Sequence, residues 1–210
     1  MILANGCSHT AGSESSVHYP GLVAGRMNMR CVNIAHPGGS NHRILRSTLE
    51  WLESNAVPEL VIIGWSTHER FELPYKGEWL DYTSNKSSDS VRIDQFYRYL
   101  DLYCADWNRG LEATLTYQLS LSTYLESRNI NYIFCNMFNS IPAHCQHPVW
   151  QALNKAKYYQ PHSSFIERLR DLHPRCFSST VHGNEFIHEC IADELYKFIE
   201  ENTTHGYTLR

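Results

Sequence analysis

The fold is decided by the stretch Met1-Ile2-Leu3-Ala4-Asn5-Gly6-Cys7-Ser8-His9-Thr10-Ala11-Gly12. Its short apolar run, Ile2 to Ala4, predicts a buried strand, and Asn5-Gly6 lets the backbone turn sharply after it. Ser8 therefore follows the carboxyl end of a strand, where open α/β sheets bind their ligands. A serine there can act as a nucleophile if a base reaches it, and the alternative is that Ser8 or Thr10 caps the next helix.

Length and composition indicate one globular domain spanning residues 1–210. Hydrophobic residues make up 42% of the chain and charged residues 19%, which is enough apolar material for a core. The formal net charge of -4 gives no reason to expect a nucleic-acid surface. No apolar run is long enough to span a membrane, so we expect no membrane partner.

The N-terminal segment and the cysteines indicate the expected cellular compartment. No basic segment precedes the first strand, so we expect no signal peptide. Seven cysteines at irregular spacings do not form a disulfide framework, which favours a reducing, cytoplasmic location. The cluster His144, Cys145 and His147 lacks the regular spacing of a zinc site, so we expect no metal and no cofactor.

Strands alternate with helical patterns along the chain, which predicts a three-layer α/β/α sandwich with a parallel, flavodoxin-like sheet of about five strands. The run Leu60 to Ile63 is β-branched without polar alternation, as expected for a parallel strand buried on both faces. The other predicted strands cover 2–4, 30–35, 130–136 and 175–178. The predicted helices cover 16–29, about 42–55, 94–107, 111–127, 165–172 and 184–201.

A surface excursion is expected from about residue 72 to 110, because Pro74, Gly77 and the polar run 83–90 interrupt the pattern. Its length exceeds what a connection needs, so we expect it to cover the mouth of the Ser8 cleft or to contact another subunit. Aromatic faces in it would suit sugar rings, although half or more are expected to pack. These aromatic residues are Trp79, Tyr82, Tyr97 and Tyr99.

Three loops follow predicted strands and should converge on one crevice. They are Gly6-Cys7-Ser8, Gly38-Gly39-Ser40-Asn41 and Gly64-Trp65-Ser66. Near the other end of the chain, His182 lies just before the last predicted helix. It is placed to lean over the edge of the sheet toward Ser8.

In this order and spacing the residues resemble the SGNH (GDSL-like) hydrolases. Ser8 matches the nucleophile of that family, Gly38 its loop glycine and His182 its base. The chain departs from the family pattern at three positions, with Cys7 in place of Asp, Ser66 in place of Asn, and Thr180 in place of the Asp that orients the histidine. As a small chain without a leader, it is also similar to phage-encoded members.

The resemblance implies that Ser8 attacks an acyl carbon and that His182 removes its proton. Backbone N–H groups of Ser8 and Gly38 would form the oxyanion hole, with Ser66 or Asn41 as a side-chain donor. Since Thr180 carries no charge, a Ser8–His182 dyad is expected. His173, in Asp171-Leu172-His173-Pro174, is the second candidate for the base.

Three further residues are assigned to substrate binding: Arg70, Trp65 and His9. Arg70 follows the third predicted strand and could bind an anionic group, whereas the alternative is a surface ion pair with Glu69 or Glu72.

The first function hypothesis is a serine esterase that removes acyl groups such as acetate from a carbohydrate or another small ester. The second is a non-catalytic binding or structural module of the same fold, for example a component of a virus particle, and the third is acyl transfer to a sugar. If the chain is such a module, we expect it to form a homo-oligomer or to be part of a virion assembly. Labelling of Ser8 by a fluorophosphonate would separate an enzyme from a module.

Overall fold

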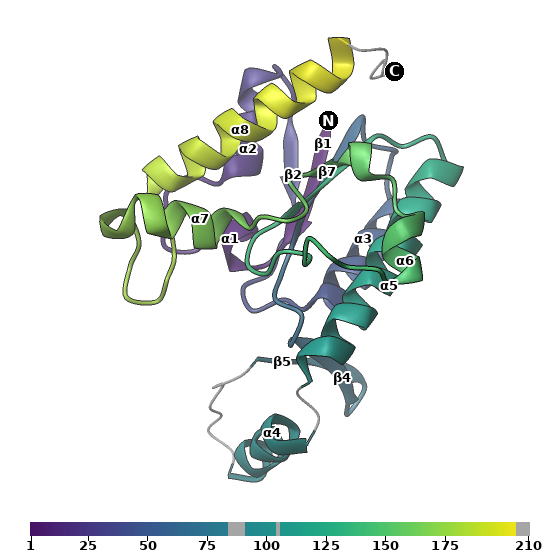
Figure 1. Cartoon of the computed structure of the whole chain (residues 1–210), viewed down its shortest axis with the longest axis vertical. Helices are drawn as coiled ribbons and strands as arrows, with labels where there is room; N and C mark the ends of the chain where they lie inside the picture. Colours follow the sequence, from purple (N-terminus) through teal and green to yellow (C-terminus); the bar gives the residue numbers. More distant parts are fainter. Residues whose placement is uncertain (84–90, 104–105, 205–210) are drawn as a thin grey trace.

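The centre of the molecule is a five-stranded parallel sheet, which a computed structural model describes for residues 1–83, 91–103 and 106–204 (Figure 1). The strand order is β2-β1-β3-β6-β7, and each neighbouring pair is parallel. The predicted α/β class and flavodoxin-like sheet are therefore confirmed. The strands are β1 (Ile2–Gly6), β2 (Cys31–Asn33), β3 (Leu60–Trp65), β6 (Tyr132–Asn136) and β7 (Tyr158–Tyr159).

Helices cover both faces of the sheet (Figure 1). One layer holds α2 (Tyr19–Arg26), α7 (Phe165–Leu172) and α8 (Glu185–Thr204), and the other holds α3 (Asn41–Ser54), α5 (Trp107–Ser127) and α6 (Pro148–Ala152). Every residue of β1, β3 and β6 is buried, as expected for strands between two helical layers. Among the described residues, no helix combines the length and the apolar character needed to cross a bilayer.

The predicted strand over Arg175–Ser178 is wrong. Pro174–Cys176 forms the short 3-10 helix η2, because proline suits the first position of a helical turn and has no N–H for a strand ladder. The fifth strand is instead β7, whose Tyr158 pairs with Phe134 after the short 3-10 helix η1 (Lys155–Lys157).

The excursion begins with an antiparallel hairpin that the sequence analysis missed. Strands β4 (Phe71–Tyr75) and β5 (Glu78–Tyr82) are joined by Lys76 and Gly77, whose φ values are 50° and 84°. Such a pair of left-handed residues is typical of the two-residue turns that match the twist of a hairpin. Helix α4 (Val91–Tyr103) follows, and residues 84–90 of the predicted polar run lie outside the described residues.

A small core holds the excursion together. Tyr82 and Tyr97 are buried with Leu100. Two of the four aromatic residues of the excursion therefore pack, as expected for half or more of them. Trp79 and Tyr99 remain exposed. Helix α5 begins at Trp107 rather than at Leu111, because the Asp106 carboxylate accepts a hydrogen bond from the Arg109 N–H and caps the first turn.

Candidate active site

Three predicted site residues follow adjacent parallel strands. Ser8 comes two residues after β1, Gly38 lies in the loop after β2, and Ser66 directly follows β3. The N–H of His36 donates to the carbonyl of Gly6, which holds the loop after β2 against the end of β1. The three residues are therefore at one edge of the sheet, as their spacing predicted.

Ser8 opens the short helix α1 (Ser8–Ala11), so its backbone N–H has no acceptor within that helix. The helix sits tightly on the sheet because Gly6 has no side chain: a Cβ there would lie 2.1 Å from Thr10 Oγ1. Thr10 Oγ1 in turn lies 3.0 Å from the hydroxyl of Tyr19. Close packing thus fixes the position of Ser8, which is only 6% exposed.

Gly38 takes a backbone conformation that other residues adopt at a cost. Its φ is 78°, and the N–H of Gly39 donates to the carbonyl of His36 across the turn. Proline at the second position and glycine at the third are the residues of a type II turn, which His36-Pro37-Gly38-Gly39 matches. The turn lies against the end of β1, because a Cβ placed on Gly39 would be 3.4 Å from the Gly6 carbonyl oxygen.

The Asn41 side chain is occupied by structural hydrogen bonds. Its Oδ1 accepts from the Ser66 N–H at 2.7 Å, and its Nδ2 donates to Thr114 Oγ1 at 2.9 Å and lies within reach of the Ser66 and Thr67 carbonyls. Asn41 thus joins α3 to the loop after β3 and to α5. We assign it to holding this loop rather than to donating to an oxyanion.

His182 lies in a tight loop between η2 and α8. Phe177 and Gly183 form an antiparallel bridge, and the Ser178 N–H donates to the His182 carbonyl at 2.8 Å. Val181 takes a φ of 66°, which is strained for a β-branched residue. Such strain persists only where the surroundings impose it, so this loop fixes the histidine.

Glu14 supplies a carboxylate to His182, and sequence analysis missed it. Glu14 Oε1 lies 3.1 Å from His182 Nδ1, and Thr180 Oγ1 donates to the same oxygen at 2.7 Å. The hydrogen bond from Thr180, one from Ser178 and the charge of His182 lower the pKa of Glu14. Nothing in the local sequence indicates this contact, because the partners are 168 residues apart.

These contacts determine where the proton of a neutral His182 lies. Thr180 Oγ1, whose proton points to Glu14, is also 3.1 Å from His182 Nδ1. Two oxygen acceptors therefore face Nδ1, so this nitrogen carries the proton and Nε2 keeps the lone pair of a base.

The ring of His182 reaches the residue next to Ser8. Its centroid lies 5.1 Å from the ring centroid of His9. No hydrogen bond joins Ser8 Oγ to His182 in the described ranges, and such contacts commonly tighten only when substrate binds. The other candidate base, His173, packs edge-on against Phe186, 5.0 Å between centroids.

His9 is buried rather than open to a substrate. Its ring is 2% exposed and packs edge-on against Phe138, with 4.7 Å between centroids. Burial, together with the nearby His182, His188 and Arg70, lowers the pKa of His9 to about 3. The ring is therefore neutral at physiological pH and forms an uncharged wall beside His182.

Arg70 lies at the same site through two contacts. Its Nη1 donates to Ser66 Oγ at 3.0 Å, and its guanidinium carbon lies 5.3 Å from the ring centroid of Phe138. Phe138, the second residue after β6, is a further site residue that sequence analysis missed. Within the described chain Arg70 forms no ion pair, so its charge is free to meet an anionic group.

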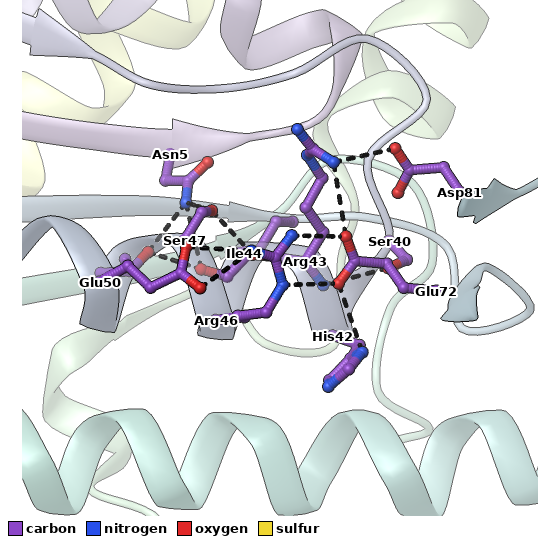
Figure 2. Close-up of polar contacts among 11 residues, drawn as sticks. Asn5, Ser40, His42, Arg43, Ile44, Arg46, Ser47, Glu50, Glu72 and Asp81 are labelled. Carbon is purple, nitrogen blue, oxygen red and sulfur yellow. Dashed lines mark hydrogen bonds and ion pairs between the residues drawn. The ribbon is translucent and has the colours of Figure 1, made fainter. Parts of the chain in front are cut away.

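The alternative pairing of Arg70 with Glu72 is wrong, because Glu72 faces α3 (Figure 2). The fully buried Glu72 carboxylate accepts from Arg46 at 2.8 and 3.1 Å and also contacts Arg43. Arg43 further reaches Asp81 at 3.1 Å. This network binds the hairpin to α3.

The attached hairpin brings the excursion to the edge of the site. Thr83, one residue beyond β5, lies against the turn: a Cβ placed on Gly38 would be 3.7 Å from its methyl group. The end of the hairpin therefore lies beside the Gly38 turn. That the excursion covers the mouth of the Ser8 cleft or contacts another subunit stays a prediction.

The prediction that Trp65 binds substrate is not supported by its position. Trp65 is 1% exposed and packs edge-on against Phe134 with 5.2 Å between centroids. We assign it to the core. No group of three or more His, Cys, Asp or Glu side chains in the described residues is arranged to hold a metal ion.

Comparison with known proteins gives a family and a fold. Residues 8–150 match the model of DUF6071, a family of unknown function. The chain belongs to this family. The matched segment contains Ser8, Gly38 and Arg70 and stops before His182. A comparison with curated protein sequences finds no match.

Solved structures with similar folds include esterases. The psychrotrophic esterase EstA from Pseudoalteromonas sp., solved with monoethylphosphonate as inhibitor, is 14% identical, with 97% of this chain and 98% of that chain covered and a TM-score of 0.58. Acetyl xylan esterase Est2A from Butyrivibrio proteoclasticus is 11% identical (97% and 64% covered, TM-score 0.53). A family two carbohydrate esterase from Clostridium thermocellum is 15% identical (97% and 64% covered, TM-score 0.54).

At these identities the likeness concerns the fold, and the expected SGNH-type architecture is confirmed. The DUF6071 chain has the sheet and helical layers of such esterases over almost its whole length.

Proposed function

We propose that this DUF6071 protein is a serine ester hydrolase in which Ser8 is the nucleophile and His182 the general base. The observation that carries the proposal is the position of His182. Its Nδ1 is held by Glu14 and Thr180, and its ring lies against His9, the residue that follows Ser8. A histidine fixed in the Nδ1–H tautomer against the short helix that begins with Ser8 has the parts needed for acyl transfer.

In the first half-reaction, Ser8 Oγ attacks the acyl carbon while His182 Nε2 takes the hydroxyl proton. The resulting tetrahedral intermediate carries one negative oxygen. It collapses when the bond to the leaving alkoxide breaks and His182 returns the proton to that oxygen, which leaves an acyl-Ser8 ester and a free alcohol.

In the second half-reaction, His182 Nε2 takes a proton from water, and the hydroxide oxygen attacks the acyl-serine. Collapse of the second tetrahedral intermediate returns the proton to Ser8 Oγ and releases the carboxylic acid. Both intermediates need hydrogen-bond donors for their oxyanion. The backbone N–H groups of Ser8 and Gly38 supply them, and Arg70, held by Ser66, contributes a positive charge nearby.

The substrate class that we propose is an acyl ester of a carbohydrate or of another small alcohol. Two structural neighbours are named as an acetyl xylan esterase and a carbohydrate esterase, which supports sugars as the alcohol component. Trp79 and Tyr99 on the excursion are exposed, and aromatic residues of this kind would suit sugar rings. The guanidinium of Arg70, which forms no ion pair within the described chain, would favour esters that carry a negative group.

The experiment is hydrolysis of p-nitrophenyl acetate by the wild type and by the variants Ser8→Ala, His182→Ala and His173→Ala. We expect Ser8→Ala and His182→Ala to lower kcat by about 10³-fold or more, and His173→Ala to retain activity, because His173 packs on Phe186. Full activity of Ser8→Ala would refute the assignment of the nucleophile.

The alternative is a non-catalytic module of the same fold, including the virion component considered from the sequence. The substitution of Asp, Asn and Asp by Cys7, Ser66 and Thr180 favours it. A correctly folded wild type that hydrolyses none of a panel of acyl esters, but binds an oligosaccharide or assembles into larger particles, would support the module. Acyl transfer would instead appear as an acylated sugar product when a sugar is added with the ester.

A further inference from the structure

A carboxylate meets the imidazole of His182 from an unexpected part of the chain. In the SGNH hydrolases, the family that the sequence resembles, the acid precedes the histidine by two or three residues. This chain has Thr180 there. Glu14, in the loop after α1, occupies the space beside Nδ1. We infer that Glu14 is the positioning residue that replaces the missing acid, so the site is a Ser8–His182–Glu14 triad. This inference rests on the proposed hydrolase function.

The geometry around Glu14 fits this role. Its Oε1 lies 3.1 Å from His182 Nδ1, and the hydroxyl of Thr180 donates to the same oxygen at 2.7 Å. Ser178 Oγ lies 2.8 Å from Thr180 Oγ1 and accepts from the His182 N–H at 3.2 Å. The hydroxyls that stand where an acid was expected thus orient a carboxylate supplied from elsewhere.

Backbone conformation on both sides supports a site that is held in place. Glu14 has a φ of 64° and Val181 a φ of 66°, and neither is glycine. Left-handed residues of this kind gather where a particular side-chain geometry is imposed by its surroundings. Here one precedes His182 directly and the other is its partner.

The surrounding charges leave Glu14 as the acid of this site. His182 is 19% exposed and Glu14 46% exposed, so the pair lies at the rim, where water screens but does not remove the interaction. Of the other groups near His182, His9 and His188 are uncharged at physiological pH, and Thr180 and Ser178 are hydroxyls. The charge of Arg70, which acts on the neighbouring His9, is positive and does not replace a carboxylate. Glu185, which is close in the fold, accepts instead from Ser16 Oγ.

The test compares Glu14→Gln with the matched control Glu185→Gln. The control also removes a carboxylate that links this loop to the start of α8, but it does not touch His182. We expect Glu14→Gln to lower kcat for p-nitrophenyl acetate by about 10- to 10³-fold with little change in KM, and to move the acidic limb of the kcat/KM profile to lower pH. Glu185→Gln should retain wild-type kinetics.

A second variant asks whether the lost group is a carboxylate. Thr180→Asp in the Glu14→Gln background places an acid at the position known from the resembling family, and it should recover at least part of the lost kcat. In the wild-type background the same Thr180→Asp change would set two carboxylates against each other, so we expect no gain there.

An activity-independent readout separates this inference from the proposed function. The ¹⁵N shifts of a neutral imidazole report which nitrogen carries the proton, and we expect Nδ1–H in the wild type and a loss of that preference in Glu14→Gln. If the wild type hydrolyses no ester and this tautomer change is still seen, the hydrolase proposal is wrong and the positioning by Glu14 stands. Unchanged kinetics and an unchanged tautomer in Glu14→Gln would overturn the inference.

Discussion

Glu14 Oε1 lies 3.1 Å from His182 Nδ1, so a carboxylate from the first loop of the sheet orients a histidine that precedes the last helix. At the candidate site, the contact joins the loop that follows α1 to the loop that precedes α8. It also makes the structure of the loop after α1 as important for the proposed chemistry as the serine itself.

Gly38 should be required for activity beyond its effect on stability. At φ 78° an alanine is strained by about 1 kcal/mol, and the strain would displace the N–H that we place in the oxyanion hole. Gly38→Ala should therefore lower kcat by roughly tenfold or more. Gly77→Ala is the matched control, since Gly77 has a φ of 84° in an open hairpin turn. Equal kcat values for both variants would exclude Gly38 from the oxyanion hole.

Arg70 should distinguish charged from neutral esters. We expect Arg70→Met to lower kcat/KM for the p-nitrophenyl monoester of succinate about 10- to 100-fold, because a hydrogen bond between charged groups is worth roughly 1.5–3 kcal/mol. The loss for p-nitrophenyl acetate should be smaller. A variant Arg70→Lys keeps the charge and tests the contribution of the planar guanidinium. The same loss for both esters would leave Arg70 only its role near the reacting oxyanion and would contradict its role in recognising an anionic substrate.

Glu72 should contribute strongly to stability, because its fully buried carboxylate is surrounded by Arg43, Arg46 and His42 (Figure 2). Removing its charge leaves the guanidinium groups of Arg43 and Arg46 without their shared partner. Glu72→Gln should reduce the free energy of unfolding in urea by about 3 kcal/mol. Glu50→Gln is the control, because Glu50 makes an exposed pair with Arg46 that should be worth about 0.5 kcal/mol or less. Equal effects of the two substitutions would show that the buried network does not hold the hairpin.

Buried histidines should make the fold sensitive to acid. Burial is the main cause that lowers the pKa of three histidines. The pKa of His9 falls to about 3, and the pKa values of His68 and His188 fall to about 4. In the unfolded chain a histidine takes up its proton near pH 6.5, so the unfolded state binds more protons below that pH. These three histidines should therefore cause no change in the free energy of unfolding above about pH 7. It should fall between pH 6.5 and 4 by up to roughly 1.4 kcal/mol per pH unit for each histidine. Urea unfolding at pH 7, 6 and 5 measures the slope, and stability that rises toward pH 5 would contradict this account.

The local sequence pattern was enough to predict the architecture and the positions of three site residues at one edge of the sheet. Buried runs such as Leu60–Trp65 followed by small polar residues determine a parallel sheet and place Ser8, Gly38 and Ser66 at one edge. The hairpin was missed because Pro74 and Gly77 were interpreted as interruptions, although a glycine in a two-residue turn also joins strands.

The partners of the site residues could not be predicted in the same way. Glu14 and His182 are 168 residues apart, and no periodicity in the sequence indicates such a contact. Similarly, Trp65 ends β3 and Asn41 begins α3, next to loops that carry chemistry in the family that the sequence resembles. Trp65 nevertheless packs against Phe134, and Asn41 bonds to Ser66 and Thr114. A single sequence indicates which loops converge, whereas side-chain partners depend on tertiary packing.

The most direct test of the central claim is the reaction of the protein with a fluorophosphonate, followed by mass spectrometry to find the modified residue. Such a reagent phosphonylates a serine whose hydroxyl is activated by a neighbouring base. The account predicts stoichiometric modification of Ser8 in the wild type, much slower modification in His182→Ala, and none in Ser8→Ala. Folded wild-type protein that stays unmodified at Ser8, or is modified equally fast without His182, would contradict it.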